Sequence, residues 1–175
     1  MPPTGHRPVI TPVPGGGDLG LVDALAQLTF AVQAALGRIA AAHDLSIIQI
    51  RLLGILRDRR PAINELARLL QLDKSSVTGL VDRAEERGLV RRTPSALDRR
   101  SVRVTITAAG QELIDQGTAA FEAEIAALVA DLSPGQRSRL SSTATRIVAA
   151  DARRRGIDIL NVEPAPAEGG EADRR

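Results

Sequence analysis

The fold of this chain is decided by residues 73–107, which read DKSSVTGLVDRAEERGLVRRTPSALDRRSVRVTIT. In the first half, four apolar residues recur at the spacing of one helix face: Val77, Leu80, Val81 and Ala84. Asp73 stands where an N-cap is expected, and Gly88 ends the helix. The apolar period then changes to 2 in two segments, 89–92 and 102–106. The stretch therefore predicts a helix followed directly by a β-hairpin, with residues 94–100 as its turn.

Helical periodicity continues on both sides of this stretch. Apolar residues at steps of three and four predict helices over 18–43, from Ser46 to the Arg59-Arg60-Pro61 turn, over 63–72, and from Ala108 onward with a break at Ser133-Pro134-Gly135. The third of these helices should bury Leu66, Leu69 and Leu70. Because it is joined to the helix after Asp73 by a tight turn, the pair has the geometry of a helix-turn-helix.

The composition indicates a globular protein. Of its 175 residues, 43% are apolar, which is enough for the core of one compact domain or of two closely joined ones. The net charge is +2, and Lys74 is the only lysine among 23 basic residues. Arginine suits bidentate contacts to phosphate and guanine, although a codon bias toward arginine would explain the surface copies equally well. The location of the arginines must therefore decide between these readings.

Several kinds of chemistry are excluded by residues that the sequence lacks. There is no cysteine, and Met1 is the only methionine, so disulfides, thiolate ligands and oxidant sensing by sulfur are ruled out. The two histidines, His6 and His43, form no metal-binding pair, and no catalytic motif is present. The glycines in residues 15–20 match G-x-G-x-x-G, but they follow a proline-rich segment and read as a linker. We expect no metal, no cofactor and no enzymatic activity.

Basic residues crowd the predicted hairpin. Residues 87–103 contain six arginines against one acid, Asp98. The arginines are Arg87, Arg91, Arg92, Arg99, Arg100 and Arg103. A helix that opens with small hydroxyl residues can approach base edges, and a basic hairpin turn can reach the adjacent groove. The pattern predicts a module that binds duplex DNA; the alternative is a set of merely solvated strand charges.

The outer helices carry long apolar stripes that a single chain cannot cover, and a second copy would cover them. A two-fold dimer would also place two recognition helices about 34 Å apart, in successive major grooves. We therefore expect a homodimer, with a helical dimerisation domain (18–45 and 108–155) around a DNA-binding domain (46–107). The proline- and glycine-rich ends, 1–17 and 156–175, are predicted to be disordered. No leader and no run of 18 apolar residues is seen, so a cytoplasmic location is expected.

The order of these elements resembles the MarR family of winged helix-turn-helix regulators. Three segments carry the resemblance: LSIIQIRLLGIL (45–56), INELARLLQLDKSSVTGLVDRAEERGLVRR (63–92) and LDRRSVRVTITAAG (97–110). The likeness spans about residues 18–155, and the D-R-R-S-x-x-V-x-x-T hairpin pattern is its most specific part. Ile50 departs from the family, where many members have an aromatic residue. The implied fold is mainly α with a small β-hairpin wing.

The resemblance implies that the helix after Asp73 lies in the major groove. The candidate DNA-binding residues are Lys74, Ser75, Ser76, Thr78, Arg83, Arg99 and Arg100. The three hydroxyl residues are expected near bases or phosphates, Lys74 on a phosphate, and Arg83 toward the DNA backbone. Alternatively, Ser75 and Ser76 only cap and solvate the helix. Gly79 is expected to permit close packing.

The resemblance also implies roles for the tip of the wing. One arginine of the tip should enter the minor groove, whose narrow A·T-rich stretches concentrate negative potential, and we assign this role to Arg99. Arg100 is expected to tie the wing to the recognition helix through Asp82. Asp98 is expected to shape the turn.

The family resemblance finally implies a pseudo-palindromic operator and a repressor that is released by a small lipophilic or anionic ligand bound between the two domains. Leu36, Ile39, Ile50 and Leu53 could line such a crevice, but core packing explains them better. Two other functions remain open. One is an architectural DNA-binding protein without an effector, and the other is a protein-interaction scaffold with the same fold.

Overall fold

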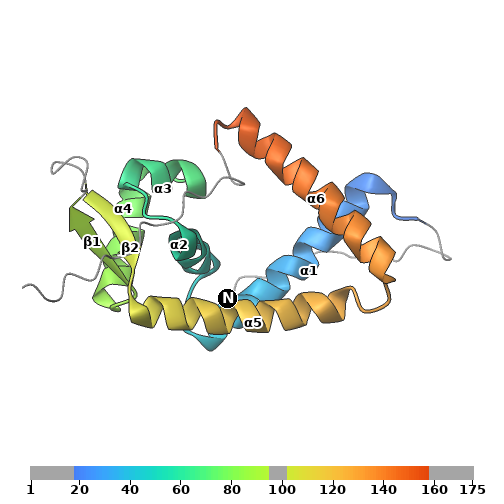
Figure 1. Ribbon diagram of the computed structural model, residues 1–175, viewed down its shortest axis with the longest axis horizontal. Helices are drawn as coiled ribbons and strands as arrows, with labels where there is room; N and C mark the ends of the chain where they lie inside the picture. Colours follow the sequence, from blue (N-terminus) through green and yellow to red (C-terminus); the bar gives the residue numbers. More distant parts are fainter. Residues whose placement is uncertain (1–17, 95–101, 158–175) are drawn as a thin grey trace, which may run out of the picture. The chain divides into compact units, whose positions relative to one another are not determined.

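The computed structural model describes residues 18–94 and 102–157, which form six helices and two strands (Figure 1). In chain order these are α1 (Gly20–Ala42), α2 (Ile47–Asp58), α3 (Ile63–Leu70), α4 (Lys74–Glu86), β1 (Val90–Pro94), β2 (Val102–Ile106), α5 (Ala108–Leu128) and α6 (Pro134–Arg154). The fold is thus mainly α with one antiparallel hairpin, as the sequence predicts.

The chain divides after Ala34 into two compact units. The described part of the first unit is the beginning of α1, where Asp18 accepts a hydrogen bond from the backbone N–H of Gly20 at 3.2 Å. Its side chains are largely exposed, Leu21 at 75% and Val22 at 79%. Among the described residues, α1 is the one helix that could cross a membrane by length and composition, a test that apolar helices of water-soluble proteins also pass.

The second unit contains the core of the predicted helix-turn-helix. The most deeply buried large side chains come from α2, α3, α4 and the hairpin: Leu52, Leu53, Leu56, Leu66, Leu70, Leu80, Val77, Val81, Val90 and Val104. The third helix ends two residues earlier than expected, because Gln71 adopts a left-handed conformation (φ 58°). The turn to α4 is then closed by a hydrogen bond of 3.0 Å, which the backbone N–H of Leu72 donates to the carbonyl of Ala67.

The two strands pair from Val90 opposite Ile106 to Pro94 opposite Val102. The segment before α3 extends this sheet at its edge, since Ala62 bridges to Arg103 and the N–H of Val104 donates to the carbonyl of Pro61 at 2.9 Å. Residues 95–101, the tip of the wing, lie outside the described residues, and the predictions for Asp98, Arg99 and Arg100 lie there with them.

The last two helices begin at well-formed caps. Ser133 and Gln136 form a capping box, with Pro134 as the first residue of α6, which explains the predicted break.

Along α6 only Ala149 and Ala152 are buried, and Ile147 is 54% exposed. Most of the large apolar side chains of α6 are therefore not covered by the described part of the chain.

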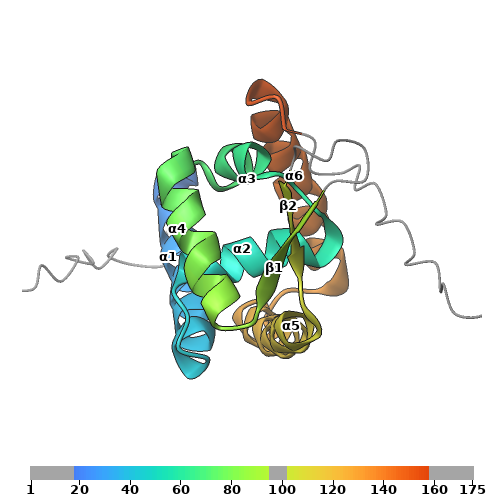
Figure 2. The same cartoon turned by 90° about the vertical axis from the view of Figure 1, so that its left-hand side faces the viewer.

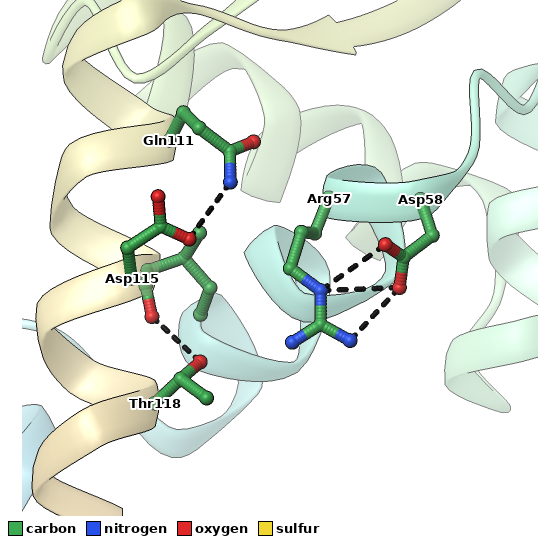
Figure 3. Close-up of polar contacts among 6 residues, drawn as sticks. Arg57, Asp58, Gln111, Asp115 and Thr118 are labelled. Carbon is green, nitrogen blue, oxygen red and sulfur yellow. Dashed lines mark hydrogen bonds and ion pairs between the residues drawn. The ribbon is translucent and has the colours of Figure 1, made fainter.

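Helix α2 packs against α5, and polar side chains flank this contact (Figure 3). On α2, the guanidinium of Arg57 donates to the carboxylate of Asp58, with Nη2 at 2.9 Å from Oδ2. On α5, Gln111 donates to Asp115 at 2.9 Å, and the Thr118 hydroxyl donates to a backbone carbonyl of the preceding turn. The hydrogen bonds to Asp58 raise the pKa of Arg57, and the charge of Asp115 adds to the effect.

Candidate nucleic-acid interface

Helix α4 lies at the front of the molecule in Figure 2, with the hairpin to its right. One face of α4 is buried, and the other is exposed to solvent. Val77, Leu80, Val81 and Ala84 are buried. All five predicted site residues that the structure describes lie on α4: Lys74, Ser75, Ser76 and Arg83 are exposed, and Thr78 is half-buried. Together they occupy the part of the helix surface that the core leaves uncovered.

The first turn of α4 is organised around its cap, Asp73. One carboxylate oxygen accepts from the backbone N–H of Ser76 at 2.8 Å and from the Ser75 hydroxyl at 2.5 Å, and the other accepts from the Ser76 hydroxyl at 2.6 Å. The hydrogen bond from Ser75, followed by those from Ser76, holds the pKa of Asp73 well below its usual range. Both hydroxyls therefore donate to the cap residue Asp73, in agreement with the alternative that Ser75 and Ser76 cap the helix. Their oxygens keep lone pairs that can accept from a base or a backbone group.

Two further residues on the exposed face interact locally. The Thr78 hydroxyl donates to the carbonyl of Lys74 at 2.8 Å. A Cβ built on Gly79 would meet only the Nη1 atom of Arg83 within 4 Å, at 3.5 Å. The expectation that Gly79 permits close packing against another element is therefore wrong. Its missing side chain instead leaves room beside Arg83 on the surface of the helix.

The wing is tied to α4 by Arg92, whereas Arg100 was the residue expected in this role. Its guanidinium pairs with Asp82 at 2.5 Å and with Glu85, while its backbone N–H donates to Glu85 Oε1 at 2.9 Å. Burial opposes the charge of Arg92, but the hydrogen bonds to the two acids outweigh it and raise its pKa. A signal existed in the sequence, because acids three residues apart lie on one helix face opposite a basic strand. The predicted pairing of Asp82 with Arg100 stays a prediction.

Several arginines of the basic segment are engaged inside the protein. Arg87 donates to the carbonyl of Asp44 at 2.7 Å, and Arg103 donates to the carbonyl of Arg60 at 2.8 Å. Arg91 approaches the Thr105 hydroxyl at 3.3 Å. With Arg92, these contacts involve four of the six arginines, so their guanidinium groups are held in place by the protein, and the charge of Arg92 is also paired with Asp82 and Glu85.

A cleft of about 450 Å³ lies between α2, α3 and the end of α6. Its lining includes Arg51, Ile55, Arg59, Leu69, Val148 and Ile157. The residues considered for a crevice from sequence do not line it. Ile39 and Leu53 are buried, as expected for core residues, and Leu36 and Ile50 are partly buried. The described residues contain no group of three or more side chains suited to hold a metal ion.

These features define a class, the winged helix-turn-helix proteins, and comparisons with known proteins refine it. Residues 43–101 match the family model described as MarR family. The transcriptional regulator PecS of Dickeya dadantii is 28% identical over 100 residues, which cover 55% of this chain and 60% of PecS. The transcriptional repressor NicR of Pseudomonas putida is 37% identical over 73 residues, covering 41% of this chain and 46% of NicR.

A solved structure with a similar fold comes from the same kind of comparison. The crystal structure of CouR from Rhodococcus jostii, bound to p-coumaroyl-CoA, superposes with a TM-score of 0.61 at 25% identity, covering 71% of this chain and 88% of CouR. The chain is therefore similar to MarR-family regulators, and the family match itself covers residues 43–101. It spans 60% of the length of PecS and 46% of the length of NicR.

Proposed function

We propose that this protein is a homodimeric, sequence-specific DNA-binding transcriptional regulator of the cytoplasm. The observation that carries the proposal is that α4 packs one face into the core and leaves four of its five candidate contact residues exposed. Lys74, Ser75, Ser76, Thr78 and Arg83 would contact the major groove and its phosphates. Arg99 would enter the minor groove, and Arg100 would steady the wing. PecS and NicR, described as helix-turn-helix regulators, support this role.

The dimer is proposed from apolar surface that the single chain leaves exposed. Phe30 on α1 is 55% exposed, and Ile147 and Val148 on α6 are 54% and 53% exposed. Apolar side chains of this size on long helices favour burial against another chain. A two-fold pair would present two copies of α4 to a pseudo-palindromic site.

Repression and release by a small molecule form the finer part of the proposal. NicR is described as a repressor, and CouR was crystallised with p-coumaroyl-CoA. The cleft beside α6 has arginines next to apolar side chains, which suits a small lipophilic or anionic ligand. The two α4 helices of a dimer can lie at a distance that fits DNA or at one that does not. Such a ligand would release DNA only if it bound more tightly to the dimer whose α4 helices do not fit DNA.

The function is tested by selecting bound sequences from random DNA duplexes. We expect an inverted repeat whose half-sites lie one helical turn apart. An architectural DNA-binding protein would instead enrich no sequence and would show a steep dependence on salt. That outcome would replace the proposal by the architectural alternative.

Arg99 separates DNA recognition from the scaffold alternative. We expect Arg99→Ala to weaken binding to the selected duplex by about 1–3 kcal/mol, because a base-edge or minor-groove contact is lost. Binding is measured by fluorescence anisotropy at fixed ionic strength. A scaffold that has lost DNA binding would show no duplex affinity in either form of the protein.

A further inference from the structure

Arg87 connects the end of α4 to the end of another helix. It is the C-cap residue of α4, and its side chain leaves the helix to donate to the carbonyls of Asp44 at 2.7 Å and His43 at 3.1 Å. These carbonyls belong to the turn that follows α1, which is closed by the N–H of Leu45 on the carbonyl of Ala40 at 2.8 Å. The last turn of α1 contains no basic residue of its own. Arg87 therefore supplies from α4 the cation that a helix C-terminus favours.

The same short segment is held a second time, by the start of α5. The Thr107 hydroxyl donates to the carbonyl of Gly88 at 2.6 Å, and the Thr107 N–H donates to the carbonyl of Leu89 at 3.0 Å. The approach is so close that a Cβ on Gly110 would lie 2.1 Å from the Leu89 oxygen. Residues 87–89 are thus a junction at which α1, α4 and α5 meet.

The opposite end of α4 is organised differently. The hydrogen bonds of Asp73 go to Ser75 and Ser76, within the first turn of the helix itself. The end that would contact bases is therefore capped locally, whereas the other end is attached to two helices of the predicted dimerisation domain. Changes in the arrangement of those helices would reach α4 through residues 87–89.

From this asymmetry we infer that Arg87 is a positioning residue for DNA recognition: it couples α4 to α1 and so sets the distance between the two recognition helices of the dimer. This inference rests on the proposed function. Removal of the guanidinium should leave the reading of each half-site intact, because that depends on the other end of α4. It should, however, let α4 adopt a wider range of positions relative to its copy, so that the protein tolerates operators with altered spacing.

The test uses the full chain and a set of duplexes that carry the selected half-sites at the selected spacing and at spacings changed by one or two base pairs. Wild type, Arg87→Ala and Arg87→Lys are compared by fluorescence anisotropy. We expect Arg87→Ala to lower the preference for the selected spacing by about five-fold or more, the scale of a typical coupling between two sites. Arg87→Lys should restore part of the preference, because an ammonium can donate to a carbonyl but lacks the planar fork of the guanidinium.

A matched control exists elsewhere in the chain. Arg137 also donates to two carbonyls at a helix end, those of Leu132 and Ala130, both at 2.9 Å, but it lies at the α5–α6 turn. Arg137→Ala should keep the spacing preference of the wild type. Thermal unfolding of each variant shows whether the protein is folded at the temperature of the binding assay. If Arg87→Ala is unfolded at that temperature, Arg87→Lys is used to test the inference.

Three results would overturn the inference, and they have different meanings. If the wild type selects no inverted repeat, the proposed function fails and the inference fails with it. If the wild type prefers one spacing and the Arg87 variants keep that preference, only the inference is wrong. If Arg87→Ala weakens all spacings equally and lowers the salt dependence of binding by about one ion, Arg87 is a phosphate contact and not a positioning residue.

Discussion

At the residue level, the contact that most directly shapes the proposed DNA-binding surface is the one between the wing and α4. Arg92→Ala removes the pairs with Asp82 and Glu85, and these groups are partly exposed, so the free energy of unfolding should fall by about 1 kcal/mol or less. Affinity for the selected duplex should fall as well, because the wing is no longer held against α4. Urea denaturation measures the free energy of unfolding, and fluorescence anisotropy measures the affinity for the duplex.

The control for this prediction is Arg38→Ala. Arg38 also forms a two-point contact with a carboxylate, that of Glu124, with N–O distances of 3.2 and 2.7 Å, but on α1 and α5. This variant should keep its duplex affinity. Equal losses of affinity in the two variants would show that Arg92 has no specific role in the wing.

Asp73 predicts a dependence of stability on pH. Its pKa is lowered in the folded protein, so the carboxylate stabilises the fold above its unfolded pKa, near 4, and this contribution is lost as the pH falls toward the lower folded value. Asp73→Asn keeps an acceptor for the Ser76 N–H but has no charge. The difference in Tm between wild type and variant should be positive at pH 7 and should shrink below about pH 4. A difference that stays constant across this range would contradict the assignment.

At the scale of elements, the junction between α5 and the hairpin depends on Gly110. Gly110→Ala would place a methyl group against a backbone oxygen, which cannot move away, and should lower the free energy of unfolding by about 1–3 kcal/mol. Gly117→Ala, in the same helix, meets only the Ile39 Cγ2 atom at 3.6 Å, an ordinary contact. It should be neutral or gain up to roughly 1 kcal/mol from helix propensity. Urea denaturation of both variants measures the two changes in the free energy of unfolding. Similar losses of stability in the two variants would contradict the role given to Gly110.

Local signals predicted most of the elements, and contacts between elements were harder to predict. The cap at Asp73, the break at Ser133-Pro134-Gly135 and the stop at Gly88 depend on nearby residues, and the structure confirms them. The end of α3 was misplaced because no strong signal marks Gln71, a non-glycine residue that adopts a left-handed conformation.

The candidate site shows the same division. The buried face of α4 follows from apolar spacing, so the residues that remain outside the core could be predicted from the sequence. The partners of Arg87 and Arg92 could not be predicted from the sequence, because many arginines could pair with the same acids and carbonyls. Which pairs form depends on how the elements pack in the folded chain. The cleft was missed because its lining joins α2 and α3 to the end of α6, nearly 100 residues further along the chain.

At the scale of the whole molecule, the proposed dimer makes α6 a sensitive element. Ile147→Glu would place a charge on the apolar surface that we assign to the interface, where its burial without a partner is costly. We expect this variant to sediment as a monomer and to lose binding to the inverted repeat. Ser142→Glu, an exposed polar position on the same helix, is the control and should remain dimeric. A dimeric Ile147→Glu protein would mean that the interface lies elsewhere.

In the proposed function, two copies of α4 and its wing recognise a particular DNA sequence. The most direct measurement compares the affinity of the protein for the selected inverted repeat with its affinity for a scrambled duplex of equal length, at one physiological salt concentration. We predict that the inverted repeat binds about 10³-fold more tightly or better, with two protomers per duplex. Equal affinity for the two duplexes would contradict the account.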